Sequence, residues 1–265
     1  MKKLSCVFLC GDLSPYGAAH LEPIATHFNV KAIIIADKKR WECFRTSLAG
    51  GKQFNYKNQS QNILATTKKF SRLLKSVRRN WKLRQRLHSI GVPVIQLHDV
   101  NSTQSMKLIS SLSPELIVSA AYPQIFSKDL IAIPPSGAVN FHPSLLPRCR
   151  GAHPHYWSLA TGETTGGVTA HFMTTHIDDG DIIAQLPIDL KNLYYNDLYR
   201  KIIDITPQLV KDVALFFNDP NSQATPQETN LITTFRNDRE IHRKLDFLNM
   251  TSEELRNRIR AGGAY

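Results

Sequence analysis

Residues 116–142, LIVSAAYPQIFSKDLIAIPPSGAVNFH, contain two short apolar runs, at 116–121 and 137–141, that we predict to be buried β-strands. Further runs of the same kind lie earlier in the chain, at residues 4–10, 30–36 and 93–97. These runs are apolar on both faces, and helical or polar stretches separate them. The pattern predicts an α/β fold whose mostly parallel sheet has helices on both faces.

The remaining elements follow from the same patterns. We expect helices ending near residue 27 and over 102–112, 195–217 and 252–260, and later strands at 167–174 and 181–188. The composition turns polar at Asp219, which is typical of a linker. The sequence therefore predicts a main domain over residues 1–218 and a short C-terminal extension over residues 219–265.

The composition narrows the class of protein. The 265 residues are 42% hydrophobic and 21% charged, which is typical of a globular protein and not of a disordered chain. No apolar run approaches the roughly 18 residues of a membrane-spanning helix, and the run at 4–10 is too short for a signal peptide. The four cysteines follow no zinc or disulfide spacing. We therefore expect a cytoplasmic protein.

The positive charge is concentrated in one segment. The chain carries a net charge of +11, whereas residues 38–90 hold 15 Lys and Arg against one acid, Glu42, which gives +14 there and −3 elsewhere. Apolar residues recur at helical spacing between positions 70 and 87, so we expect a basic amphipathic helix in an insertion over residues 38–90. Such a face is either simply solvated or attracts a phosphate-rich partner, namely a nucleotide, an RNA or an acidic protein.

Three polar residues near one predicted strand suggest catalysis. Asn140 and His142 stand two positions apart at the strand end, so their side chains point to the same side. Asp178 follows 36 residues beyond His142. The intervening chain is long enough to return to the same end of the sheet, so an amide, an imidazole and a carboxylate can converge.

These residues favour acyl transfer over other chemistry. The sequence lacks a G-x-G-x-x-G turn and a phosphate-binding P-loop, and Ser144 lies in no nucleophile elbow. The nearby His153, His155, His171 and His176 follow no metal-ligand spacing, so we expect no metal. Asn140 can donate a hydrogen bond to an oxyanion, and protonated His142 can act as a general acid. Asp178 beside His142 is expected to raise the pKa of the imidazole.

Cys149 and His171 are two further residues near this stretch. Arg148 and Arg150 flank Cys149, and two guanidinium groups can lower the pKa of a thiol. The mechanism has no use for a thiol there, so we interpret Cys149 as incidental. We interpret His171 as a structural histidine at a strand end.

Taken together, the motifs resemble those of the folate-dependent formyltransferases. The resemblance rests on Asn140-x-His142, on the SLLP run at 144–147, on Arg150-Gly151, and on residues 167–180 with Asp178. That family includes glycinamide ribonucleotide, methionyl-tRNA and amino-sugar N-formyltransferases. The resemblance implies a Rossmann-like formyltransferase domain, with Asn140, His142 and Asp178 as the catalytic residues and no metal.

The resemblance also implies a co-substrate and its pocket. The formyl donor would be 10-formyltetrahydrofolate, and three segments would line its pterin ring. The residues concerned are Gln124, Ile125, Phe126, Ser144, Leu145, Leu146, Pro147, Thr174, Thr175, His176 and Ile177. These assignments come from the family and not from spacing or composition.

The acceptor is less closely defined by the sequence. Methionyl-tRNA formyltransferases carry a further C-terminal domain, which makes a nucleic-acid acceptor the less favoured interpretation here, and glycinamide ribonucleotide formyltransferases lack the insertion and the extension. We therefore expect a small-molecule amine, with a nucleotide-linked amino sugar ahead of N5-hydroxyornithine and of a carrier-bound aminoacyl group. A different class also stays open, namely an inactive folate- or RNA-binding module. The sequence does not predict an oligomeric state.

Overall fold

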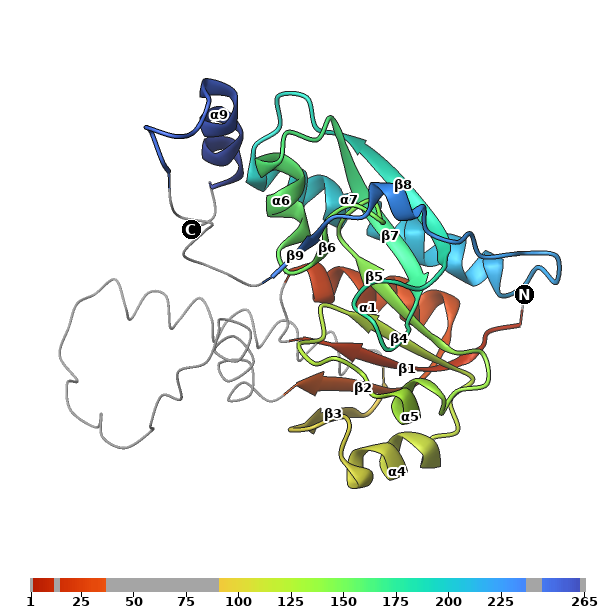
Figure 1. The fold of residues 1–265 in the computed structure, drawn as a ribbon. Helices are drawn as coiled ribbons and strands as arrows, with labels where there is room; N and C mark the ends of the chain where they lie inside the picture. Colours follow the sequence, from red (N-terminus) through yellow and green to blue (C-terminus); the bar gives the residue numbers. More distant parts are fainter. Residues whose placement is uncertain (1, 12–14, 37–90, 237–244, 263–265) are drawn as a thin grey trace, which may run out of the picture.

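The computed structural model describes residues 2–11, 15–36, 91–236 and 245–262. Seven strands among these residues form one sheet in the order β3-β2-β1-β4-β5-β7-β8 (Figure 1). The strands are β1 (Ser5–Cys10), β2 (Asn29–Ala36), β3 (Val94–Leu97), β4 (Leu116–Ala120), β5 (Ala138–His142), β7 (Thr165–Phe172) and β8 (Ile182–Asp189). The expected basic helix and the rest of the 38–90 insertion lie outside the described residues.

The first five strands of this order, β3 through β5, are parallel to one another. Strand β7 runs antiparallel to its neighbours β5 and β8, so β8 has the same direction as the first five. Every residue of β1 and β4 is buried, because helices cover both faces of the sheet. The predicted α/β fold with a mostly parallel sheet is therefore confirmed. The predicted bounds of these strands differ from the observed ones by at most two residues.

Helices build a separate core on each face of the sheet. Helices α1 (Pro15–His27) and α7 (Tyr195–Phe216) pack on one face, where Phe8, Val118 and Leu209 are fully buried. The other face carries α4 (Thr103–Ser111) and the short α5 (Lys128–Ile131), which pack through Ile109 and Leu130. The sequence does not predict α5, since four residues are too few for a periodic pattern.

The stretch that follows β5 leaves the sheet before it returns. Its elements are the two-residue β6 (Arg150–Gly151) and helix α6 (Pro154–Ala160). Beyond α7 the chain forms the 3₁₀ turn η1 (Thr229–Leu231), strand β9 (Thr234–Phe235) and helix α9 (Ser252–Ala261). Strand β9 pairs with β6, and α9 lies beside α6 (Figure 1).

The polar stretch after Asp219 is therefore not a detached linker. Phe235 stacks on Trp157 at a ring separation of 4.1 Å, and Ala261 is fully buried in the main core. These contacts attach the described part of the extension to the main domain. The division at residue 218 stays a prediction.

Candidate active site

Strand β5 presents two of the three candidate catalytic residues side by side. Asn140 pairs with His171 on β7, and His142 pairs with Thr169, so both side chains lie on one face as predicted. His142 is buried, and its Nε2 lies 3.0 Å from the carbonyl oxygen of Cys149. Because a carbonyl oxygen only accepts, Nε2 carries a hydrogen, and the proton that titrates is the one at Nδ1.

Asp178 lies in the connection between β7 and β8 and reaches back to both residues. Its Oδ2 is 3.5 Å from His142 Nδ1, and its Oδ1 accepts a hydrogen bond of 3.4 Å from Asn140 Nδ2. The backbone N–H of Gly151 donates to Oδ2 at 2.8 Å. Asp178 itself has a φ of 50°, in the left-handed region that Asp tolerates better than most residues. The structure thus brings Asn140, His142 and Asp178 together.

The electrostatics of the pair differ from the expectation in one respect. Burial lowers the pKa of His142 below its usual value, and the Asp178 carboxylate opposes this effect without overcoming it. Burial raises the pKa of Asp178, but His142, His171 and the Gly151 N–H together hold it below its usual range. Asp178 is therefore a carboxylate at neutral pH, and a proton placed on His142 is readily given up. Sequence reasoning missed this because it weighed the charge and not the burial.

His171 belongs to the same cluster and does more than end a strand. Its Nδ1 donates to the carbonyl oxygen of Phe172 at 2.8 Å, and its Nε2 lies 3.3 Å from Asn140 Nδ2. That Nε2 also lies 3.5 Å from Asp178 Oδ1. His171 thereby helps to orient the Asn140 amide.

The buried side chain of Arg150 forms a second charged contact next to the cluster, with a partially exposed partner. Its guanidinium pairs with Asp179, the neighbour of Asp178, and also donates to Gln227 Oε1. The sequence motif Arg150-Gly151 pointed to this position, but no pattern indicated Asp179 or Gln227 as its partners.

The first predicted folate segment follows β4. The side chain of Gln124 is engaged internally, since it donates to His98 O at 2.8 Å and accepts from Val100 N at 2.9 Å. Phe126 is buried in the core under α4 and α5, whereas Ile125 is 49% exposed. Only Ile125 of this segment therefore offers its side chain to a ligand in the present arrangement.

The second predicted folate segment, residues 144–147, is a tightly held loop after β5. Ser144 is buried, and its hydroxyl donates to Arg148 O at 2.9 Å. The Leu146 N–H donates to Thr169 Oγ1 at 3.1 Å, which ties the loop to β7. These contacts hold the loop in place beside His142.

The third predicted folate segment, residues 174–177, is an exposed turn that leads into Asp178. The Thr174 hydroxyl accepts a hydrogen bond of 3.1 Å from His176 N, and Ile177 is 45% exposed. An exposed apolar side chain thus stands directly before the carboxylate. The assignment of all three segments to a folate pocket stays a prediction.

The Cys149 thiol is not activated. It is 1% exposed, and burial raises its pKa to about 11, whereas the flanking Arg148 lowers it only slightly. Arg148 lowers this pKa in the expected direction, but the desolvation of the buried thiolate outweighs it, so the net shift is upward. The interpretation of Cys149 as incidental to catalysis fits this burial.

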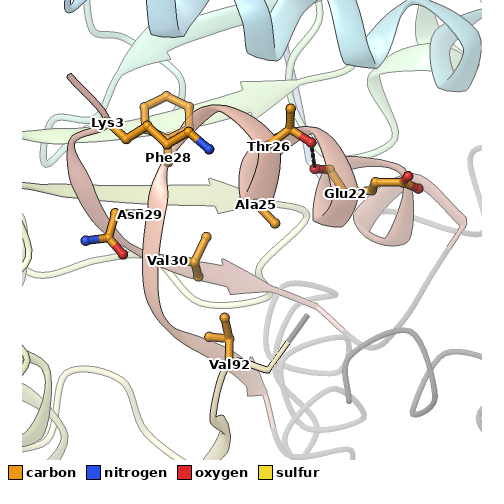
Figure 2. A pocket seen from close by; sticks show the side chains of 8 residues that line it. All are labelled: Lys3, Glu22, Ala25, Thr26, Phe28, Asn29, Val30 and Val92. Carbon is orange, nitrogen blue, oxygen red and sulfur yellow. Dashed lines mark hydrogen bonds between the residues drawn. The ribbon is translucent and has the colours of Figure 1, made fainter. Parts of the chain in front are cut away.

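A surface pocket elsewhere on the molecule is separate from this cluster. Figure 2 shows that it lies where β1, β2 and β3 begin, next to the end of α1. Its lining consists of Lys3, Glu22, Ala25, Thr26, Phe28, Asn29, Val30 and Val92. Ligands of parallel sheets bind at the opposite, carboxyl ends of the strands, so this pocket does not serve the cluster around Asp178.

Two further findings concern metals and membranes. Within the described ranges, no group of three or more His, Cys, Asp or Glu side chains is arranged to hold a metal ion. No helix in that part of the chain is long and apolar enough to cross a bilayer.

The fold and the cluster together define a class of protein. The mostly parallel sheet carries Asn140 and His142 on β5, and Asp178 contacts both of them. A family model described as "Formyl transferase" matches residues 29–213. The match covers more than half of the chain. This protein belongs to the formyl transferase family.

Individual relatives agree with that assignment. The chain is 35% identical over 186 residues to a methionyl-tRNA formyltransferase of Syntrophus aciditrophicus, a match that covers 67% of this chain and 58% of the relative. A sugar N-formyltransferase of Shewanella has a similar structure, with a TM-score of 0.63 and 19% identity over 98% of this chain and 90% of that one.

A second solved structure, the N-formyltransferase of Helicobacter canadensis in complex with folinic acid and dTDP-3-aminofucose, gives a TM-score of 0.61. It is 19% identical and covers 98% of this chain and 81% of that one. The chain spans about half of the length of the curated relatives that it matches.

Proposed function

We propose that this protein is an N-formyltransferase that moves a formyl group from 10-formyltetrahydrofolate to an amine. The observation that carries the proposal is the contact of Asp178 with both Asn140 and His142, at 3.4 and 3.5 Å. This arrangement combines a neutral donor, an imidazole that exchanges a proton and a fixed carboxylate. It contains no nucleophile of its own, which suits direct attack by the amine of the acceptor.

Each residue has a distinct part in this reaction. The acceptor amine attacks the formyl carbon, and the oxygen of the resulting intermediate accepts hydrogen bonds from the Asn140 amide and the His142 imidazolium. His142 then returns a proton to the departing nitrogen of tetrahydrofolate, which its lowered pKa favours. Asp178 orients the imidazole and accepts a hydrogen bond from a water molecule, and this water takes the proton that the amine loses and passes it to solvent.

We propose a nucleotide-linked amino sugar as the acceptor. The sugar N-formyltransferase of Shewanella and the N-formyltransferase bound to dTDP-3-aminofucose each overlap 98% of this chain, extension included, whereas a glycinamide ribonucleotide transformylase overlaps 85%. The extension is attached to the candidate site through β9 and Gln227. The overlap therefore includes a segment that contacts the residues around Asp178.

A methionyl-tRNA acceptor is the second candidate. The curated relatives that support it are methionyl-tRNA formyltransferases, at 30% to 37% identity across several matches. A hydroxylated ornithine is chemically equivalent as an acceptor, but none of these relatives favours it.

Release of tetrahydrofolate from 10-formyltetrahydrofolate tests the proposal. The assay uses a panel of acceptors, namely a dTDP-linked amino sugar, N5-hydroxyornithine, glycinamide ribonucleotide and charged initiator tRNA. Release that depends on the amino sugar supports both the reaction and the proposed acceptor. Release with another member of the panel supports the reaction and makes that member the acceptor. Folate binding without release from any member favours the inactive binding module instead.

A further inference from the structure

Residues 225–235, which we call the strap, run from the beginning of β8 to β6 and contact the loop that carries Asp178. Thr225 and Ile182 exchange two backbone hydrogen bonds of 2.8 Å at one end of the strap. At the other end, β9 pairs with β6, and Arg150 N donates to Thr233 O at 2.8 Å. The strap lies beyond residues 29–213, the part that the family model matches.

Gln227 is the side chain of the strap that contacts the loop. Its Nε2 donates to the carbonyl oxygens of Asp178 at 2.9 Å and of Gly180 at 2.7 Å. Its Oε1 accepts from Arg150, at 3.1 Å from Nε and 2.7 Å from Nη2. One amide thus uses both of its hydrogens and its oxygen on the two segments that flank the Asp178 carboxylate.

These four hydrogen bonds fix the distance between β6 and the loop. β6 supplies the Gly151 N–H that binds Asp178 Oδ2, and the loop supplies the main chain of Asp178 itself. Arg150 is buried and also pairs with Asp179, so β6 has little freedom to shift on its own. Gln227 therefore links the main chain of Asp178 to β6, the strand whose Gly151 N–H binds the Asp178 carboxylate.

We propose that Gln227 is a positioning residue for formyl transfer: it holds the Asp178 carboxylate in register with His142 from the C-terminal extension. This inference rests on the function proposed above. The carboxylate acts only where it reaches His142 Nδ1 and the Asn140 amide, and both contacts are already long, at 3.5 and 3.4 Å. A displacement of about 1 Å at such a site can cost roughly a hundredfold in rate.

The test compares Gln227→Ala with Gln223→Ala, the same change at an exposed glutamine two residues before the strap. We expect Gln227→Ala to lower kcat by at least about tenfold while the KM values for both substrates stay near those of the wild type. Gln223→Ala should match the wild type in kcat and KM. Equal kcat values for the two variants would overturn the proposal.

A second readout does not depend on turnover. His142 is faced by Asp178, His171 and Arg150, and Asp178 is the group among them that raises its pKa. Retraction of Asp178 in Gln227→Ala should therefore lower the pKa of His142, measured by NMR titration of the full chain and assigned with His142→Gln. If the wild type shows no turnover with any acceptor, the proposed function fails, and the titration alone decides the role of Gln227. An unchanged titration contradicts that role.

Gln227→Met covers the case in which the alanine variant does not fold. Methionine keeps the length of the side chain and removes all four hydrogen bonds. Loss of kcat in a folded Gln227→Met protein supports positioning. A Met variant that also fails to fold would make Gln227 a residue of overall stability and would overturn the proposal.

Discussion

Replacement of Asp178 by asparagine removes one charge from the candidate site and leaves its shape nearly intact. The asparagine oxygen can still accept from the Gly151 N–H, which donates to Oδ2 at 2.8 Å in the native chain. The attraction between an imidazolium at Nδ1 and the carboxylate 3.5 Å away is lost. At an effective dielectric constant of about 20, that attraction is on the order of 5 kcal/mol before desolvation is subtracted.

Because only part of this energy is specific to the transition state, we expect kcat to fall by roughly a hundredfold to ten-thousandfold. Binding of tetrahydrofolate, measured by isothermal titration calorimetry, should stay near that of the wild type. The matched control is Asp181→Asn, the same change at an exposed position of the same loop, which should leave kcat unaltered. An Asp178→Asn protein with the kcat of the wild type would refute the assignment of the carboxylate.

Three further predictions concern other parts of the structure. Gly151→Ala puts a methyl group against the Phe235 carbonyl at a φ of 89°, so both kcat and the melting temperature should fall. The control Gly91→Ala has a φ of 68° and open space around it, so it should lower only the melting temperature. Burial lowers the pKa of His20 to about 4, so the unfolded chain binds the extra proton below about pH 6.5 and stability falls on acidification. His20→Leu should remove roughly 2 kcal/mol of the loss between pH 6.5 and 5 in urea titrations, and an equal loss in both proteins would contradict this. The buried thiol of Cys149 should resist iodoacetamide at pH 8 in the folded protein when labelling is mapped by mass spectrometry, and rapid alkylation there would contradict its raised pKa.

The sheet could be predicted because its strands are apolar on both faces. β1 and β4 are buried throughout, and a continuous apolar run of that length is typical of a strand that helices cover on both sides. The short elements could not be predicted, since the two residues of β6 and of β9 leave no periodic signal. Their pairing depends on a contact between segments more than 80 residues apart.

The candidate site, like the fold, could be predicted from the sequence only in part. The convergence of Asn140, His142 and Asp178 follows from strand geometry and from the family motifs, and the structure brings the three together. Gln227 gives no such signal, because its partners Arg150 and Asp178 are 77 and 49 positions away. The direction of the His142 pKa was also out of reach, since it depends on burial by segments that are distant in sequence.

The strap also sets the time at which the site is completed during synthesis. A chain emerges from the ribosome from its N-terminus, so the strands up to β5 can pair before residues 225–235 exist outside the exit tunnel. Until Gln227 docks, the main chain of Asp178 lacks one of its anchors. We therefore expect nascent chains that stop shortly after α7 to contain an ordered sheet and a loosely held Asp178 carboxylate. The proposed formyl transfer would then become possible only late in translation.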